Sequence, residues 1–208
     1  MIRRIAICKS QVFPKVIKYT DVRSYVFTFT FISLAVATPW VFHQFHLGGP
    51  TFLPIHFFVL MAGLLFGWRA GLIVGLFTPI ISFAISGMPA IVILPQIVVE
   101  ISVYGLIVGI LREKFNLRVI WSLIGAMISG RLALLLVLSI LYFIKGAVYG
   151  PLSVYTGMDV EVNPFAVFWS TVTLSWPGII IQLVSIPLII KPLEIIAVKK
   201  GWDSTNIG

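Results

Sequence analysis

Two ionisable residues, Glu100 and Arg131, lie deep within long apolar stretches of this sequence. At about 1.5 Å per residue of α-helix, Glu100 lies about 13 Å from Ile91, and Arg131 lies about 18 Å from Val119. Both depths are close to the middle of a hydrocarbon core about 30 Å thick. A charge at that depth costs on the order of 3 kcal/mol or more, so such side chains face a partner or a wet cavity. We therefore take Glu100 and Arg131 as the functional centre of the chain.

Further polar and aromatic residues are expected to surround this pair. Residues four apart share one face of a helix, which places Gln96 and Tyr104 on the face of Glu100. The other candidates are Trp169, Thr173 and Trp176 on one face of the last span, Asn163 just before it, and His56 at the outer end of the second span. Together they predict a mostly apolar small-molecule site with few polar anchors. Trp169 also fits an interfacial anchor, and Trp176 a core filler.

The pair itself has two interpretations. Intramembrane charges often pair with one another, so Glu100 and Arg131 could form a structural ion pair between adjacent antiparallel helices. Alternatively, Arg131 holds a substrate carboxylate through two parallel hydrogen bonds, and Glu100 binds a hydroxyl or amide of the same ligand or positions Arg131. The two interpretations are compatible if the pair opens when a ligand enters.

The composition requires a membrane protein. The 208 residues are 59% hydrophobic and 11% charged, with a mean hydropathy of +1.07, whereas soluble domains carry about 25% charged residues. The pattern predicts an all-α integral membrane protein with six transmembrane helices. The expected spans are 24–42, 52–67, 70–86, 91–111, 119–144 and 165–190, with a longer polar loop before the last.

The basic residues set the orientation of these spans. Of the 15 Lys and Arg residues, 13 fall in the leader 1–23, the two short turns around Arg69 and 112–118, and the tail 191–208. Positive residues concentrate in cytoplasmic loops, so both termini are predicted to be cytoplasmic. The net charge of +8 is therefore explained by membrane topology, and we expect no nucleic-acid partner. The predicted organisation is a basic leader at 1–23, a membrane domain at 24–190 and a cytoplasmic tail at 191–208.

Small residues at four-residue spacing predict close helix packing. Gly-x-x-x-Gly pairs occur at 63–67, 71–75 and 105–109 on successive spans. Lipid tails are as apolar as Leu, so membrane helices associate where small residues let their backbones approach. These pairs fit packing within the chain. The looser pair of Ser33 and Ala37 on the first span is the candidate docking face for a second membrane subunit.

Signals for catalysis and for metal binding are absent from the sequence. It contains no His-Glu-x-x-His, no Gly-x-Ser-x-Gly and no phosphate-binding loop with Lys. His43, His46 and His56 are expected at the outer face without a nearby carboxylate or cysteine, so we expect no metal site. Neither catalytic residues nor a cofactor is predicted, and energy for any transport must come from a partner or an ion gradient.

Several segments resemble the substrate-binding (S) components of energy-coupling-factor (ECF) vitamin transporters. The run Leu53 to Gly75, LPIHFFVLMAGLLFGWRAGLIVG, is similar to the second and third spans of that family. The segments Ser86-Gly87-Met88-Pro89, Glu100 with Tyr104-Gly105, and Gly130-Arg131 resemble the same group. The likeness covers 49–131, and beyond it the general six-span layout agrees.

The resemblance implies a non-enzymatic subunit in a prokaryotic cell membrane that captures a vitamin from outside. It also implies a membrane coupling subunit and two cytoplasmic ATPases as partners. The family docks through Ala-x-x-x-Ala on the first span, and Ser33 with Ala37 departs from that motif. Arg131 favours an anionic vitamin such as pantothenate, niacin or biotin, unless Glu100 already satisfies it. Riboflavin remains possible because a flavin ring could stack on a Trp.

Two other functions remain open at the level of sequence. One is a stand-alone transporter coupled to protons, with Glu100 as the proton site. It predicts uptake that is abolished when the proton gradient collapses. The other is a scaffold subunit without a ligand, in which Glu100 and Arg131 fix only the helix register. It predicts that replacing both residues with Leu and Met leaves partner binding intact.

Overall fold

In the computed structural model, the residues that can be described are 22–44, 49–146, 148–150 and 163–199. The predicted basic leader lies almost entirely outside these ranges, as does most of the polar loop before the last span. His46 lies outside them as well.

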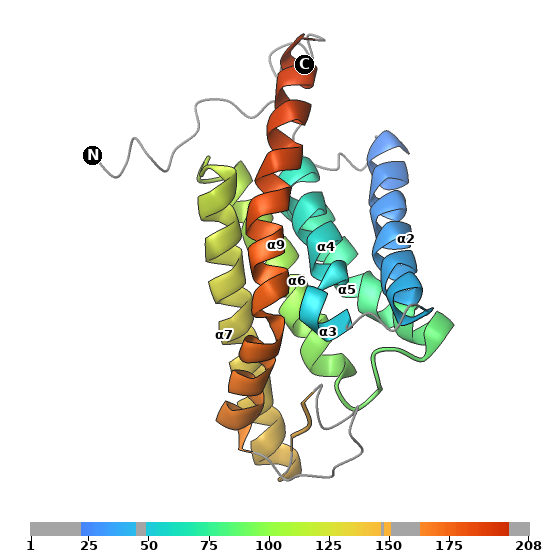
Figure 1. Ribbon diagram of the computed structural model, residues 1–208, viewed down its shortest axis with the longest axis vertical. Helices are drawn as coiled ribbons and strands as arrows, with labels where there is room; N and C mark the ends of the chain where they lie inside the picture. Colours follow the sequence, from blue (N-terminus) through green and yellow to red (C-terminus); the bar gives the residue numbers. More distant parts are fainter. Residues whose placement is uncertain (1–21, 45–48, 147, 151–162, 200–208) are drawn as a thin grey trace, which may run out of the picture.

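The secondary-structure elements of the described residues are all α-helices, and successive long helices run in opposite directions (Figure 1). This agrees with the all-α membrane class predicted from composition. The helices are α2 (Val22–Gln44), α3 (Gly49–Phe52), α4 (Pro54–Phe66), α5 (Trp68–Ser86), α6 (Leu94–Glu113), α7 (Val119–Lys145) and α9 (Pro164–Lys199).

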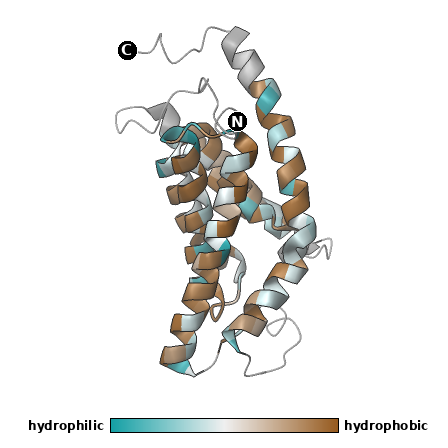
Figure 2. Cartoon of the chain, turned by 90° about the vertical axis from the view of Figure 1, so that its left-hand side faces the viewer, coloured by the Kyte–Doolittle hydropathy of each residue, from teal (hydrophilic) through white to brown (hydrophobic). Residues whose placement is uncertain are grey.

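Four of these helices, α5, α6, α7 and α9, are long and apolar enough to cross a membrane. Two shorter apolar helical segments, Tyr25–Val41 and Pro54–Phe66, belong to α2 and α4. Apolar residues follow most of each helix in Figure 2, and hydrophilic colour gathers toward the helix ends. The count of six spans remains a prediction.

The predicted second span, 52–67, corresponds to α4, and Leu53 separates α4 from the short helix α3 before it. Leu53 adopts φ 51 and ψ 48, in the left-handed region. Pro54 disfavours the right-handed helical conformation in the residue before it, which interrupts the helix at Leu53. Pro54 itself is well placed at the start of α4, where its missing N–H leaves no gap in the hydrogen-bond ladder.

The last helix is longer than predicted, since α9 continues past residue 190 to Lys199. Pro187 and Pro192 lie inside it, and each removes one backbone hydrogen bond without ending the helix. The residues after Pro192 are mostly Leu, Ile, Ala, Glu and Lys, which favour helix.

Glycines join α4, α5 and α6 into one tightly packed unit. A Cβ on Gly71 would lie 2.2 Å from the carbonyl oxygen of Gly105, and a Cβ on Gly63 would lie 2.7 Å from the same oxygen. Neither position can hold a larger side chain without moving a backbone. The predicted small-residue pairs on these spans therefore serve packing within the chain.

The two short turns and the C-terminal end of α9 lie at one end of the bundle, the upper end in Figure 1. Between α6 and α7, Asn116 takes φ 52, and Arg112 donates from Nη1 to the Leu117 carbonyl at 3.0 Å. Asn tolerates this left-handed conformation better than most residues. The tight turn fixes the register of α6 against α7.

Candidate functional site

Glu100 on α6 and Arg131 on α7 form a buried ion pair. Oε1 of Glu100 lies 2.9 Å from Nη1 of Arg131, and the side chains are 5% and 10% exposed. Glu100 and Arg131 are separated from Asn116, in the turn, by nearly the same number of residues. Because α6 and α7 are antiparallel, the two side chains come to the same level. The pairing that the sequence left as one of two interpretations is present in the structure.

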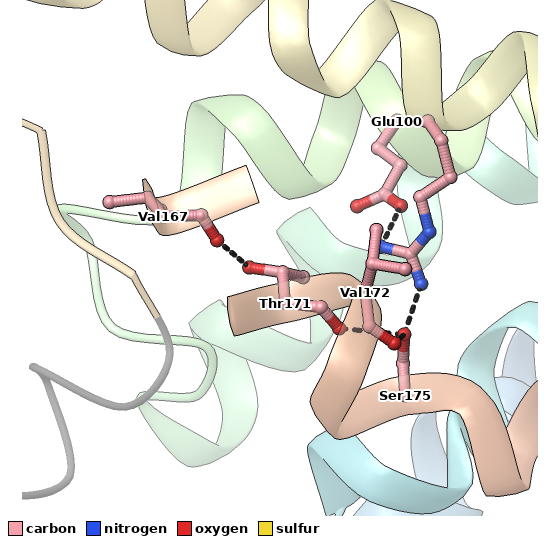
Figure 3. Close-up of polar contacts among 6 residues, drawn as sticks. Glu100, Val167, Thr171, Val172 and Ser175 are labelled. Carbon is pink, nitrogen blue, oxygen red and sulfur yellow. Dashed lines mark hydrogen bonds and ion pairs between the residues drawn. The ribbon is translucent and has the colours of Figure 1, made fainter. Parts of the chain in front are cut away.

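Ser175 on α9 is a third member of this group. Nη2 of Arg131 donates to Oγ of Ser175 at 2.5 Å, and that hydroxyl donates to the Thr171 carbonyl at 2.7 Å (Figure 3). The Ser175 hydroxyl proton is therefore directed along its own helix, which leaves an oxygen lone pair for the guanidinium. Glu100 and Ser175 approach the guanidinium from different helices.

Ser175 was not among the site residues predicted from the sequence. The available signal was a row of polar residues at helical spacing on the last span, Thr171, Ser175 and Gln182. Ser175 and Gln182 are each 1% exposed. Residues at such intervals lie along one helix face, and this row marks the inner face of α9.

His56 and Tyr104 extend the group toward α4. Their rings meet edge to face with centroids 5.0 Å apart, and they are 7% and 1% exposed. Arg131 is close enough to interact electrostatically with both. His56 was expected at the outer face, whereas the structure buries it in the first turn of α4, against the ring of Tyr104 on α6.

We call the residues His56, Glu100, Tyr104, Arg131 and Ser175 the buried polar cluster. Among the described residues, four polar atoms of the cluster have no hydrogen-bond partner. One, Oε1 of Glu100, is held in the ion pair with Arg131. The other three are Nε2 of His56, the hydroxyl of Tyr104 and Nε of Arg131. An unpaired buried polar group costs about 1–3 kcal/mol. Three such groups at one place are costly for a purely structural element, and a bound polar molecule would satisfy them.

Gln96 lies on the face of α6 that carries Glu100, as predicted, and it is 3% exposed. Its Nε2 donates to the Tyr149 carbonyl at 3.0 Å. This bond ties the beginning of α6 to the residues that follow α7. Gln96 therefore already has a protein partner near the cluster.

The remaining predicted ligand residues lie away from the cluster. Trp169, Thr173 and Trp176 share one face, as expected, but that face is exposed, with the two Trp side chains at 59% and 58%. Asn163 is exposed and accepts a hydrogen bond from the Phe165 backbone N–H at 3.0 Å, which caps the first turn of α9. Their roles in ligand binding stay predictions.

The proposed docking pair, Ser33 and Ala37, is exposed on α2. Neither residue is used to pack α2 against its neighbours. Within the described ranges, no three His, Cys, Asp or Glu side chains are grouped so that they could hold a metal ion.

Apolar helices around a buried polar cluster define a polytopic membrane protein of the small-molecule-binding class. The sequence model of the family "ECF transporter, substrate-specific component" matches residues 24–190, and the chain belongs to this family. It is therefore a substrate-binding membrane subunit of an ECF transporter, as the resemblance implied. No curated protein and no solved structure matches the chain.

Proposed function

We propose that this protein captures a vitamin or a related micronutrient and delivers it to an ATP-driven uptake complex. The observation that carries the proposal is the buried polar cluster, which has polar atoms without hydrogen-bond partners on three helices. The chain that contains it belongs to the ECF substrate-specific family. A small-molecule site is mostly apolar and contains few, well-placed polar groups. The cluster meets that description.

We further propose six transmembrane helices with both termini in the cytoplasm of a prokaryotic cell. Support comes from the shared end of the bundle, which carries the α4–α5 turn next to Arg69, the α6–α7 turn at 112–118 and the C-terminal end of α9 (Figure 1). Positive residues retained on one side favour the cytoplasm for that side. The membrane domain would then comprise residues 24–190, between a basic leader and a short tail.

The proposed binding residues are the members of the buried polar cluster, with Gln96 beside it. Trp169, Thr173, Trp176 and Asn163 are proposed for a second group that meets the ligand on its way in. The proposed partners are a membrane coupling subunit and two cytoplasmic ATPases. Their docking face would be α2 around Ser33 and Ala37, because small exposed residues permit close approach of another helix.

Mass spectrometry of small molecules released from the detergent-purified protein tests this function. We expect a vitamin-sized compound at up to one molecule per chain, and its loss in the Arg131→Met variant. Uptake in cells should require co-expressed ATPases. Uptake without them that stops when the proton gradient collapses would contradict the proposal and favour Glu100 as a proton site.

A further inference from the structure

The cluster already balances its own charges. Glu100 and Arg131 carry opposite charges and meet at 2.9 Å, while the other members, His56, Tyr104 and Ser175, are residue types that are mainly neutral near pH 7. A ligand with a net charge would leave that charge unbalanced among apolar helices. Desolvation makes an unbalanced charge far more costly there than in water.

Both terminal nitrogens of the Arg131 guanidinium already have a protein partner. Nη1 faces Glu100, Nη2 donates to Ser175, and of its three nitrogens only Nε lacks a partner among the described residues. A carboxylate fork needs two parallel N–H groups. Nε offers a single N–H, so a ligand carboxylate would have to share a terminal nitrogen with Glu100 or Ser175 to form that fork. It would also place a second anion beside a guanidinium whose charge Glu100 already balances.

The atoms that remain free suit an uncharged polar group. Nε of Arg131 can only donate a hydrogen bond, the Tyr104 hydroxyl can donate or accept, and Nε2 of His56 can do either according to its tautomer. They come from α7, α6 and α4, and the His56 and Tyr104 rings add apolar surface at 5.0 Å from each other. The uncharged groups that can bond to such atoms are amides, ring carbonyls and hydroxyls, and they would do so without adding charge.

We propose that the ligand is electrically neutral where it meets the buried polar cluster, and that the Glu100–Arg131 ion pair stays closed around it. This inference rests on the proposed function and narrows it to uncharged vitamins or vitamin amides. It replaces the preference for an anion that Arg131 alone suggested.

Matched ligand pairs that differ in charge test the proposal. The probes are nicotinamide against nicotinate, pantothenol against pantothenate, and biotinamide against biotin, each titrated calorimetrically into the purified protein at pH 7. In the pair that the protein recognises, the neutral member should bind about 100-fold more tightly than the anionic member, because the anion carries the cost of one unpaired charge near mid-membrane. In Glu100→Gln the preference should reverse, since Arg131 is then free for a carboxylate.

Glu113→Gln is the control, because it removes the other carboxylate of α6, which accepts from the Trp68 N–H at 3.4 Å and lies outside the cluster. It should keep the wild-type preference. Tighter binding of an anionic member by the wild-type protein, or an anion among the molecules released from it, would overturn the inference and leave the proposed function standing. If no probe binds and no compound is released, the proposed function itself fails, and this inference fails with it.

Discussion

The ring of Tyr104 on α6 lies directly against Gly130 on α7. A Cβ on Gly130 would lie 2.4 Å from two atoms of that ring. Glu100 is one turn from Tyr104 on α6, and Arg131 follows Gly130 on α7. The absence of a side chain at Gly130 therefore allows the close approach through which the buried ion pair forms.

Replacing Gly130 with Ala should separate α6 from α7 and weaken the ion pair. The ring of Tyr104 is 1% exposed, so it has little room to move, and we expect a loss of about 1–3 kcal/mol in stability, typical of overpacking. Thermal unfolding in detergent measures the effect. Gly125→Ala is the matched control, since its Cβ would meet only the side chain of Leu111. Equal losses in both variants would contradict this account.

Removing one member of the ion pair should cost more than removing both. Arg131→Met leaves Glu100 buried without its partner, which costs about 3–5 kcal/mol in comparable pairs. Glu100→Gln combined with Arg131→Met leaves no full charge and should recover much of that stability. A double-mutant cycle on unfolding free energies gives the coupling between the two residues. Additive losses would show that the pair does not act as a unit.

Tyr104→Phe should separate binding from stability. The hydroxyl has no hydrogen-bond partner among the described residues, so its removal should leave the unliganded protein as stable as before or slightly more so. Ligand binding should weaken by about 0.5–1.5 kcal/mol, the net value of one hydrogen bond. Calorimetry and thermal unfolding together test this. Tyr142→Phe, at a position 41% exposed, is the control and should leave both quantities unchanged.

Ser33→Leu and Ala37→Leu should impair assembly without affecting ligand binding. Both residues are exposed on α2, so larger side chains fit the isolated subunit but obstruct a closely packed partner helix. Co-purification with the coupling subunit and cellular uptake should both fall, while ligand affinity is retained. Ala166→Leu, another exposed small residue, on α9, provides the control. Unchanged assembly would place the docking face elsewhere.

Much of the helical framework was predictable because hydropathy and turn chemistry are local properties. The predicted break between the fourth and fifth spans at 112–118 matches the turn between α6 and α7. The position of this turn also places Glu100 and Arg131 at one level, because α6 and α7 are antiparallel and the chain folds back between them. The break between α3 and α4 at Leu53 was not predicted from the sequence, although Pro54 was the local signal for it.

The sequence by itself determined the membrane class and the approximate boundaries of most helices, and it placed Glu100 and Arg131 at one level, with their pairing as one of two interpretations. The tertiary structure decided how each helix is rotated about its own axis. It turned Ser175 inward and Trp169 outward on α9, and it buried His56 against Tyr104. The physical reason is that lipid is as apolar as a protein core, so hydropathy does not distinguish the two sides of a membrane helix. Small residues and polar partners set that rotation, and these contacts exist only once the helices pack.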